Sequence, residues 1–376
     1  MPIKDNLYAW LVQNIVIPRM EILDKPGFIV SQFTEGKEQV YLREIFFPEL
    51  LLANIETKIV EKYGEKGKHA LYSAGKKFGY RYALTSKFPK AANVSEKEFI
   101  SFCYKLVRFV ESMYAKGIKH EIDMKSRTLT LQMKDYMSCR LNGLGFFLAD
   151  GSISGIWAYM LSDNSIEGTH INCQGRGSEQ CDVICGPIDL LKDKYKAYLT
   201  ETDMSSLELT PEYKTINQIR PANFSKNSCR TLLDANVLKY NQGIISFKGD
   251  RYVLNESCSM YLLERELKKL PGADEIIYQE AFKYFKTMGE REKDQKFISD
   301  FFPALGWGDI LQTTKNGKPV AYSTYFPWTR FTKDVNFAMY RGMMSGLVSG
   351  IRNETINFTK FEQSMAQCYM TLNLST

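Results

Sequence analysis

A histidine and three cysteines lie close together in the sequence, in the pattern His170-x-x-Cys173-x7-Cys181-x3-Cys185. The residues Gln-Gly-Arg-Gly-Ser that follow Cys173 are typical of a tight turn, so two strands joined there would bring Cys173 and Cys181 together. Cysteine and histidine are the side chains that zinc prefers. The pattern lacks the two-residue spacing of a zinc ribbon. Three interpretations therefore stay open: a structural zinc site, buried free thiols, and redox or iron–sulfur chemistry.

Other patterns that carry chemistry are missing from the sequence. It contains no Walker loop, no Gly-x-Gly-x-x-Gly after a strand, no Gly-x-Ser-x-Gly and no pair of carboxylates at a spacing suited to a pocket. His69 follows a Lys-Gly-Lys run and His120 lies in a predicted strand, and we expect both at the surface. We therefore expect no catalytic residues and a protein that is not an enzyme.

Composition places this chain of 376 residues among ordinary globular proteins, with 44% hydrophobic and 24% charged residues. Aromatic residues make up 13%, more than a core alone needs, which allows a pocket for a flat apolar molecule. The 49 basic and 43 acidic residues are interspersed, so the net charge of +6 does not favour nucleic acid. Because long apolar runs and a signal-like N-terminus are missing, we expect no membrane span, a cytoplasmic location and reduced cysteines.

An internal repeat organises the chain around these residues. Gly27-Phe-Ile-Val-Ser31 recurs as Gly243-Ile-Ile-Ser246, and Gly151-Ser-Ile-Ser-Gly155 recurs as Gly342-Met-Met-Ser-Gly346. The separation between matched residues shrinks along the chain, as expected for a second copy with shorter loops. We predict an N-terminal helix over 1–19, a first domain over 20–186, a helix and linker over 187–228, and a second, shortened domain over 229–376.

Periodicity predicts the elements of each copy. In the first copy we predict strands over 27–33, 39–43, 120–124, 128–133, 165–172 and 180–185, and helices from about 48 and over 68–85, 95–116 and 144–161. The second copy ends with a helix over 335–351 and strands over 355–362 and 366–373. The expected fold class is α+β, with two tandem domains, each an antiparallel sheet with helices packed on one side.

Two segments of the first copy resemble a known family. Residues 145–155 form a glycine-rich helix, and residues 170–182 read His-Ile-Asn-Cys-Gln-Gly-Arg-Gly-Ser-Glu-Gln-Cys-Asp. Together they resemble the closing half of a 4-vinyl reductase domain. Residues 27–82 are similar to the segment that precedes this domain in bacterial activators that respond to phenol and xylene. The resemblance implies tandem copies of a ligand-sensing domain with the fold of the TRAPP trafficking subunits, usually dimeric.

The resemblance also implies a zinc site. In the phenol sensors an upstream Cys, a Glu and the two Cys of the closing strands hold the ion. Cys173 and Cys181 match the last two, and His170, itself a good zinc ligand, stands at the Glu position. No cysteine stands at the upstream position, so Cys185, or Cys139 if the loop allows it, has to supply the fourth ligand. The expected site is a structural zinc held by His170, Cys173, Cys181 and Cys185.

In that family, helices of the domain surround a buried pocket between the helix layer and the sheet. Such a pocket suits a small hydrophobic or aromatic ligand, although aromatic residues at helical spacing more often fill a core. The candidate pocket residues are Tyr80, Tyr82, Phe102, Tyr104, Phe146, Phe147, Trp157 and Tyr159.

The leading expectation is a non-enzymatic sensory protein that binds a small hydrophobic or aromatic molecule and carries a structural zinc in its first domain. It would act as a homodimer, or as a pseudo-dimer of its two copies, and through a downstream protein partner. The alternative is a protein-interaction scaffold with a vestigial pocket, which the loss of the Cys173 counterpart in the second copy favours. A third alternative, a reductase, lacks any nicotinamide or flavin fingerprint.

Overall fold

Three antiparallel sheets and their covering helices form a mixed α+β fold among the residues that the structure describes, which confirms the expected fold class. The computed structural model describes residues 20–35, 38–144, 147–195, 224–241, 244–327, 334–364 and 369–374. The helix predicted over 1–19 and residues 196–223 of the predicted linker lie outside these ranges. None of the described helices is long and apolar enough to cross a membrane.

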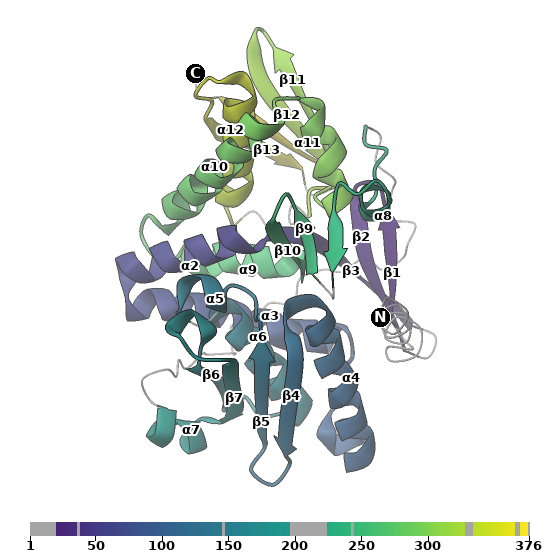
Figure 1. Cartoon of the computed structure of the whole chain (residues 1–376), viewed down its shortest axis with the longest axis vertical. Coiled ribbons are helices and arrows are strands. Elements are labelled where there is room, and N and C mark those ends of the chain that lie inside the picture. The colour runs from purple at the N-terminus through teal and green to yellow at the C-terminus, as the bar shows by residue number, and fades with distance from the viewer. Residues whose placement is uncertain are drawn as a thin grey trace.

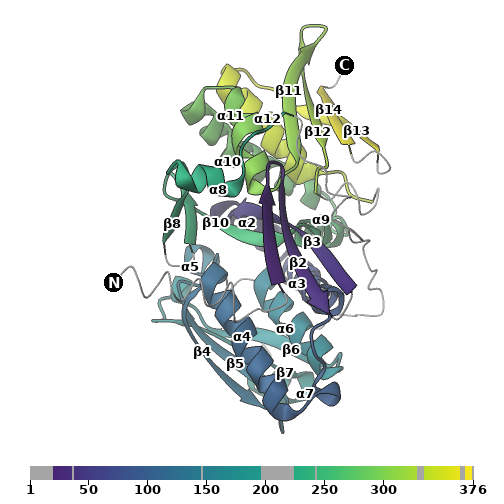
Figure 2. The same ribbon diagram turned by 90° about the vertical axis from the view of Figure 1, so that its right-hand side faces the viewer.

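The largest sheet is built from both halves of the chain. Its strand order is β1-β2-β3-β10-β9-β8, so β3 of the first half pairs with β10 of the second at its centre. Figures 1 and 2 show this sheet between the two smaller ones. The two copies are therefore not separate units, because the strands that begin each copy join in one sheet. The strands are β1 (Met20–Lys25), β2 (Phe28–Glu35), β3 (Glu38–Pro48), β8 (Lys239–Asn241), β9 (Ile244–Phe247) and β10 (Asp250–Glu256).

A similar order of elements follows the central strands in each half, although α5 and α7 have no counterpart among the described elements of the second half. The two smaller sheets have the matching orders β4-β5-β7-β6 and β11-β12-β14-β13. The first half contains α2 (Glu49–Tyr63), α3 (Glu65–Thr85), α4 (Glu96–Tyr114), β4 (Lys116–Asp123), β5 (Thr128–Lys134), α5 (Cys139–Asn142), α6 (Phe147–Leu161), β6 (Ile166–Asn172), β7 (Cys181–Pro187) and α7 (Ile188–Tyr195). The second contains α8 (Cys229–Asp234), α9 (Ser257–Leu267), α10 (Ala273–Glu292), α11 (Lys296–Phe301), β11 (Asp309–Lys315), β12 (Lys318–Thr324), α12 (Ala338–Arg352), β13 (Phe358–Ser364) and β14 (Tyr369–Leu374).

Glycines let one helix pair in each half pack closely, α3 with α6 and α10 with α12. A Cβ atom at Gly155 would lie 2.1 Å from the carbonyl oxygen of Lys76, and one at Gly346 would lie 2.3 Å from that of Phe282. No larger residue fits at such a separation without moving a helix. The glycine-rich segments that mark the repeat in the sequence are thus the packing faces of α6 and α12.

A buried polar cluster joins α3, α6 and β6 in the first half. The Tyr72 hydroxyl donates to Glu167 Oε2 at 2.6 Å and lies 2.8 Å from Ser154 Oγ. Lys76 Nζ lies 2.5 Å from Glu167 Oε1, with both side chains buried. Burying two charges is favourable only when they are paired this closely.

The second half repeats the hydroxyl contacts of this cluster without the charges. The Tyr278 hydroxyl lies 3.0 Å from Ser345 Oγ and 3.1 Å from Asn357 Oδ1. Phe282 stands four residues after Tyr278, as Lys76 does after Tyr72. The buried ion pair of the first half is thus replaced in the second half by Phe282 and the exposed Asn357, with the Arg341 guanidinium 5.4 Å from the Tyr278 ring.

The two halves interlock at the centre of the shared sheet, where Phe46 and Leu254 lie opposite each other. Trp307 Nε1 donates to the carbonyl oxygen of Phe46 at 3.0 Å, and the Tyr114 hydroxyl donates to that of Leu254. Each donor comes from the half that does not contain its acceptor, so the two bonds hold the halves together reciprocally.

Buried carboxylates lie beside this centre. Glu44 and Glu256 are opposite each other on β3 and β10, and Arg81 Nη1 of α3 lies 2.6 Å from Glu256 Oε2. The Ser31 hydroxyl donates to Glu44 Oε1 at 2.8 Å. Burial, reinforced by the neighbouring Glu256, raises the pKa of Glu44 from 4.5 to about 8.

This shift predicts a pH dependence of stability that the Glu44→Gln variant reduces. In the unfolded chain Glu44 loses its proton near pH 4.5, whereas in the folded protein it keeps the proton until about pH 8. The folded state binds more protons between these values, so the free energy of unfolding falls as the pH rises through this interval. Urea unfolding at several pH values between about 5 and 8 measures the slope of the free energy of unfolding against pH. A slope in Glu44→Gln equal to that of the wild type would contradict the assignment, and the exposed Glu61→Gln is the control.

Candidate metal centre and apolar cavity

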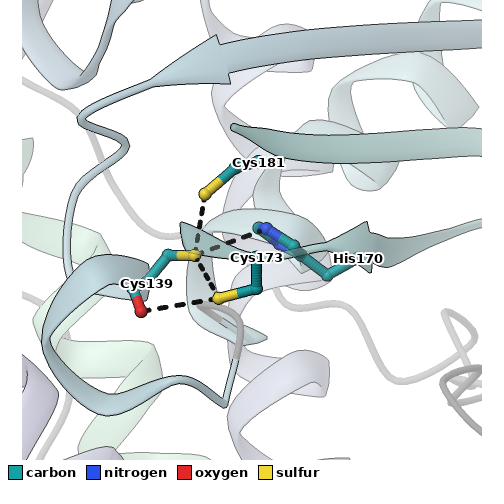
Figure 3. A group of neighbouring side chains, drawn as sticks. All are labelled: Cys139, His170, Cys173 and Cys181. Atoms are coloured by element: carbon teal, nitrogen blue, oxygen red, sulfur yellow. Dashed lines mark hydrogen bonds between the residues drawn. The ribbon is translucent and has the colours of Figure 1, made fainter. Parts of the chain in front are cut away.

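Four side chains in the first half form a compact group of metal-ligand types: Cys139, His170, Cys173 and Cys181 (Figure 3). All four are buried, and their ligand atoms lie within 4.8 Å of one another. Cys139 Sγ lies 2.6 Å from Cys173 Sγ, 2.9 Å from Cys181 Sγ and 3.5 Å from His170 Nε2. Three sulfurs and one imidazole nitrogen are donor types that a tetrahedral zinc site uses.

The predicted hairpin turn brings three of these ligands together. Strands β6 and β7 pair, and the turn between them places Cys173 beside Cys181, the first residue of β7. Gly177 has a φ of 88°, a conformation that favours glycine, and the carbonyl oxygen of Cys173 accepts from Arg176 N at 3.0 Å and Ser178 N at 3.2 Å. The turn is thus held by backbone bonds of its own.

The fourth member of the group is Cys139, the first residue of α5, whereas Cys185, expected from the sequence as a ligand, is not part of this group. Cys181 and Cys185 are four residues apart on β7, which separates them by about 13 Å along the strand. Cys139 can approach because β5 pairs with β7, with Met133 opposite Cys181, so the chain leaving β5 runs towards the metal ligands. A Cβ atom at Gly175 would lie 2.2 Å from the carbonyl oxygen of Cys139, so the turn needs glycine there.

Asp150 of α6 orients the histidine, and the spacing of the cysteines does not point to this residue. Its carboxylate oxygens lie 3.1 Å and 3.2 Å from His170 Nδ1, and both side chains are buried. A proton held on Nδ1 by this carboxylate leaves Nε2, which faces the sulfurs, free to bind a metal. Burial disfavours the charged ring, but Asp150 and Cys181 outweigh it and raise the pKa of His170 to about 10. Metal binding therefore displaces a proton.

The Asp150→Asn variant is expected to bind zinc about 10- to 100-fold more weakly, because loss of such a carboxylate partner weakens metal sites by this factor. Competition with a chromogenic chelator measures the affinity. The control is Asp182→Asn, since Asp182 lies on the same hairpin and accepts from Asn172 and Gln180, outside the metal group. Equal affinities for Asp150→Asn and the wild type would show that Asp150 does not support the ligand.

A small apolar cavity lies on the other side of α6, between α4, α6 and the strands β4 and β5. Its volume is about 50 Å³. Trp157 Nε1, at its wall, donates to the carbonyl oxygen of Arg127 at 3.0 Å. The lining residues are Cys103, Leu106, Val107, Val110, Ile118, Leu129, Leu131, Ile153, Ile156, Trp157 and Met160.

Of the eight aromatic residues predicted to line a pocket, Trp157 lies at this cavity. Rings of four others pack against one another or against Phe88, in the pairs Tyr80–Tyr159, Tyr82–Phe88 and Phe88–Phe102. Tyr104 is 48% exposed and packs on His120 at the surface. Phe147 is half-buried against the core, and Phe146 lies outside the described residues. The spacing of these aromatic residues predicts that they lie on helices, but it does not show which face of each helix borders the cavity.

Much of the aromatic content instead fills the core of the second half. Ring centroids lie 4.4 Å apart for Phe247 and Phe301, 5.3 Å for Phe301 and Phe302, and 6.4 Å for Phe302 and Trp307. Cys368, the counterpart of Cys181 in the sequence, lies outside the described residues. The metal group and the cavity described above both belong to the first half.

Comparison with known proteins finds likeness in structure and not in sequence. No protein-family model matches the sequence, and no curated protein matches it. Among solved structures, the chain is similar to the crystal structure of the phenol-responsive sensory domain of the transcription activator PoxR with phenol. That match has 14% identity and a TM-score of 0.37, and it covers 48% of this chain and 91% of that one.

Proposed function

We propose that this chain is a non-enzymatic protein that binds a small apolar molecule in the cavity of its first half, in a fold braced by a structural zinc ion. The observation that carries the proposal is that the metal group and the cavity share one sheet. Leu129 and Leu131 of β5 line the cavity, and Met133 of the same strand lies opposite the ligand Cys181. Zinc held by four protein ligands has no open position, so its part is to fix the sheet that forms the cavity wall.

The lining suits an apolar occupant but requires movement on binding. A dry apolar cavity of about 150 Å³ holds benzene, whereas this one measures about 50 Å³. Met160 has a flexible side chain that can adapt, and α4 closes one side of the cavity. We propose that the ligand shifts these groups as it enters, which gives binding a structural consequence that a partner could read.

The shared central sheet supports a pseudo-dimer within one chain, and association of two chains into a homodimer stays a prediction. Its two inner strands, β3 and β10, come from the two halves and complete each other. The expected protein partner stays a prediction.

Elemental analysis and thermal unfolding with toluene or phenol as probes test the proposal. We expect one zinc ion per chain and a rise in Tm with the probe, since a ligand at 100 times its Kd stabilises by about 2.7 kcal/mol. Met160→Ala, which enlarges the cavity, should increase the rise, and Val110→Leu, which adds a methylene to the lining, should reduce it. If neither probe raises the Tm of the wild type or of Met160→Ala, the cavity binds nothing and the scaffold alternative replaces this proposal.

A further inference from the structure

We infer that the second half of the chain completes the metal centre, because Arg251 of β10 positions the loop that leads to Cys139. The inference rests on the zinc site proposed above. Residues 135–138 join β5 to α5 and so position Cys139, the first residue of α5, whereas His170, Cys173 and Cys181 come from a single hairpin. The hairpin alone offers three ligands, so the position of this loop decides whether Cys139 is placed to complete a site of four ligands.

Arg251 reaches the start of the loop across the boundary between the halves. Its Nη1 donates to the carbonyl oxygen of Asp135 at 2.8 Å and lies 3.8 Å from Glu49 Oε1. The side chain is 6% exposed and projects from a strand that is paired on both sides, with β3 and with β9. Arg251 therefore holds the Asp135 backbone through Nη1 alone, while its Nε and Nη2 are buried without a hydrogen-bond partner among the described residues.

Glu49, the first residue of α2, extends this support to the residues on either side of Cys139. Its Oε1 accepts from Ser138 N at 2.7 Å, and its Oε2 accepts from Arg140 Nη2 at 3.0 Å. Ser138 has a φ of 59°, a conformation that is unfavourable for a residue with a side chain. The loop therefore depends on these contacts to hold the Cys139 sulfur among the other ligands.

The first half contains a matching arginine that has no metal ligand near its contact. Arg43 precedes Phe46 by the same three residues by which Arg251 precedes Leu254, and it is 1% exposed. Its Nη2 donates to the carbonyl oxygen of Gly306, in the other half, at 2.8 Å. Both arginines bridge the halves, but only Arg251 contacts the loop of Cys139. Arg43 is thus a control for effects of the interface alone.

The test compares Arg251→Met, Arg251→Lys and Arg43→Met in the full chain. We expect Arg251→Met to weaken zinc binding at least tenfold, Arg251→Lys to restore part of the loss, and Arg43→Met to change it less than twofold. Cobalt(II) as a substitute reports the ligands directly, because each thiolate adds to the charge-transfer absorbance. In Arg251→Met this absorbance should fall as expected for the loss of one of the three thiolates.

Zinc binding and the contact of Arg251 with the loop before Cys139 are coupled in both directions. Removing zinc from the wild type should therefore speed hydrogen exchange in residues 250–256. Should Arg251→Met fail to fold, Glu49→Gln tests the same support and should also weaken zinc binding and the cobalt absorbance. Unchanged affinity and spectrum in these variants, or equal losses in Arg43→Met, would overturn the inference while leaving the zinc site in place. A wild type that binds no zinc would instead overturn the proposed site itself.

Discussion

The Cys173→Ser variant is expected to lose the proposed zinc ion and, with it, the folded structure around the β6–β7 hairpin. Zinc bound at structural sites contributes about 10–16 kcal/mol in small zinc-binding peptides at neutral pH. Whole domains are stable by only about 5–15 kcal/mol. Loss of the ion after removal of one of its four ligands should therefore cost about as much free energy as the whole first half gains by folding. Elemental analysis and limited proteolysis of the purified variant measure the two losses.

Two further cysteine variants separate the metal site from a general effect of losing a buried thiol. Cys139→Ser should behave as Cys173→Ser does, because Cys139 belongs to the ligand group. Cys185→Ser should keep the zinc, although Cys185 is equally buried and lies on the same strand as Cys181. Loss of zinc from Cys185→Ser, together with its retention in Cys139→Ser, would reverse the assignment of the fourth ligand.

The Lys76→Met variant is expected to lower the free energy of unfolding by about 3–5 kcal/mol. Lys76 and Glu167 are buried and paired at 2.5 Å, and removing one member of such a pair leaves the other charge uncompensated in the interior. Urea denaturation measures the change. The exposed pair of Lys58 and Glu61 provides the comparison, since Lys58→Met should change the free energy of unfolding much less than Lys76→Met does.

The second half suggests how this loss can be repaired. It builds the equivalent contacts from Phe282 and Asn357, without charges. The double variant Lys76→Met with Glu167→Gln should therefore recover most of the stability, because the neutral amide still meets the Tyr72 hydroxyl. If the double variant is no more stable than Lys76→Met alone, the cost does not come from the buried charge.

Local features of the fold follow from the sequence. The helix predicted over 95–116 is α4 over Glu96–Tyr114, where Ser95 accepts from Glu98 N as a cap. The hairpin predicted over 120–133 is β4 and β5. Both are set by periodicity and turn residues within a short stretch of chain, so a single sequence is enough to find them.

Features that depend on long-range pairing were missed, because periodicity does not say which strands become neighbours. The alternation of apolar residues in β3 and β10 is the same whether each strand closes its own sheet or pairs with the other. The sequence allows either Cys139 or Cys185 as the fourth ligand and does not favour Cys139. Only the pairing of β5 with β7 brings the loop before Cys139 close to Cys181. Arg251 and Glu49 support that loop from other elements, and no local pattern relates them to it.

The split of the central sheet between the two halves has a consequence for synthesis of the chain. Strand β3 ends at Pro48, and its partner β10 begins only at Asp250. At about 5–20 residues per second, the ribosome needs on the order of 10–40 s to make the residues between them. Throughout that time β3 offers an unpaired edge that another nascent chain could join. Expression of this protein should therefore depend on chaperone supply and on spacing between ribosomes, and a truncated first half should aggregate unless β10 is added to it.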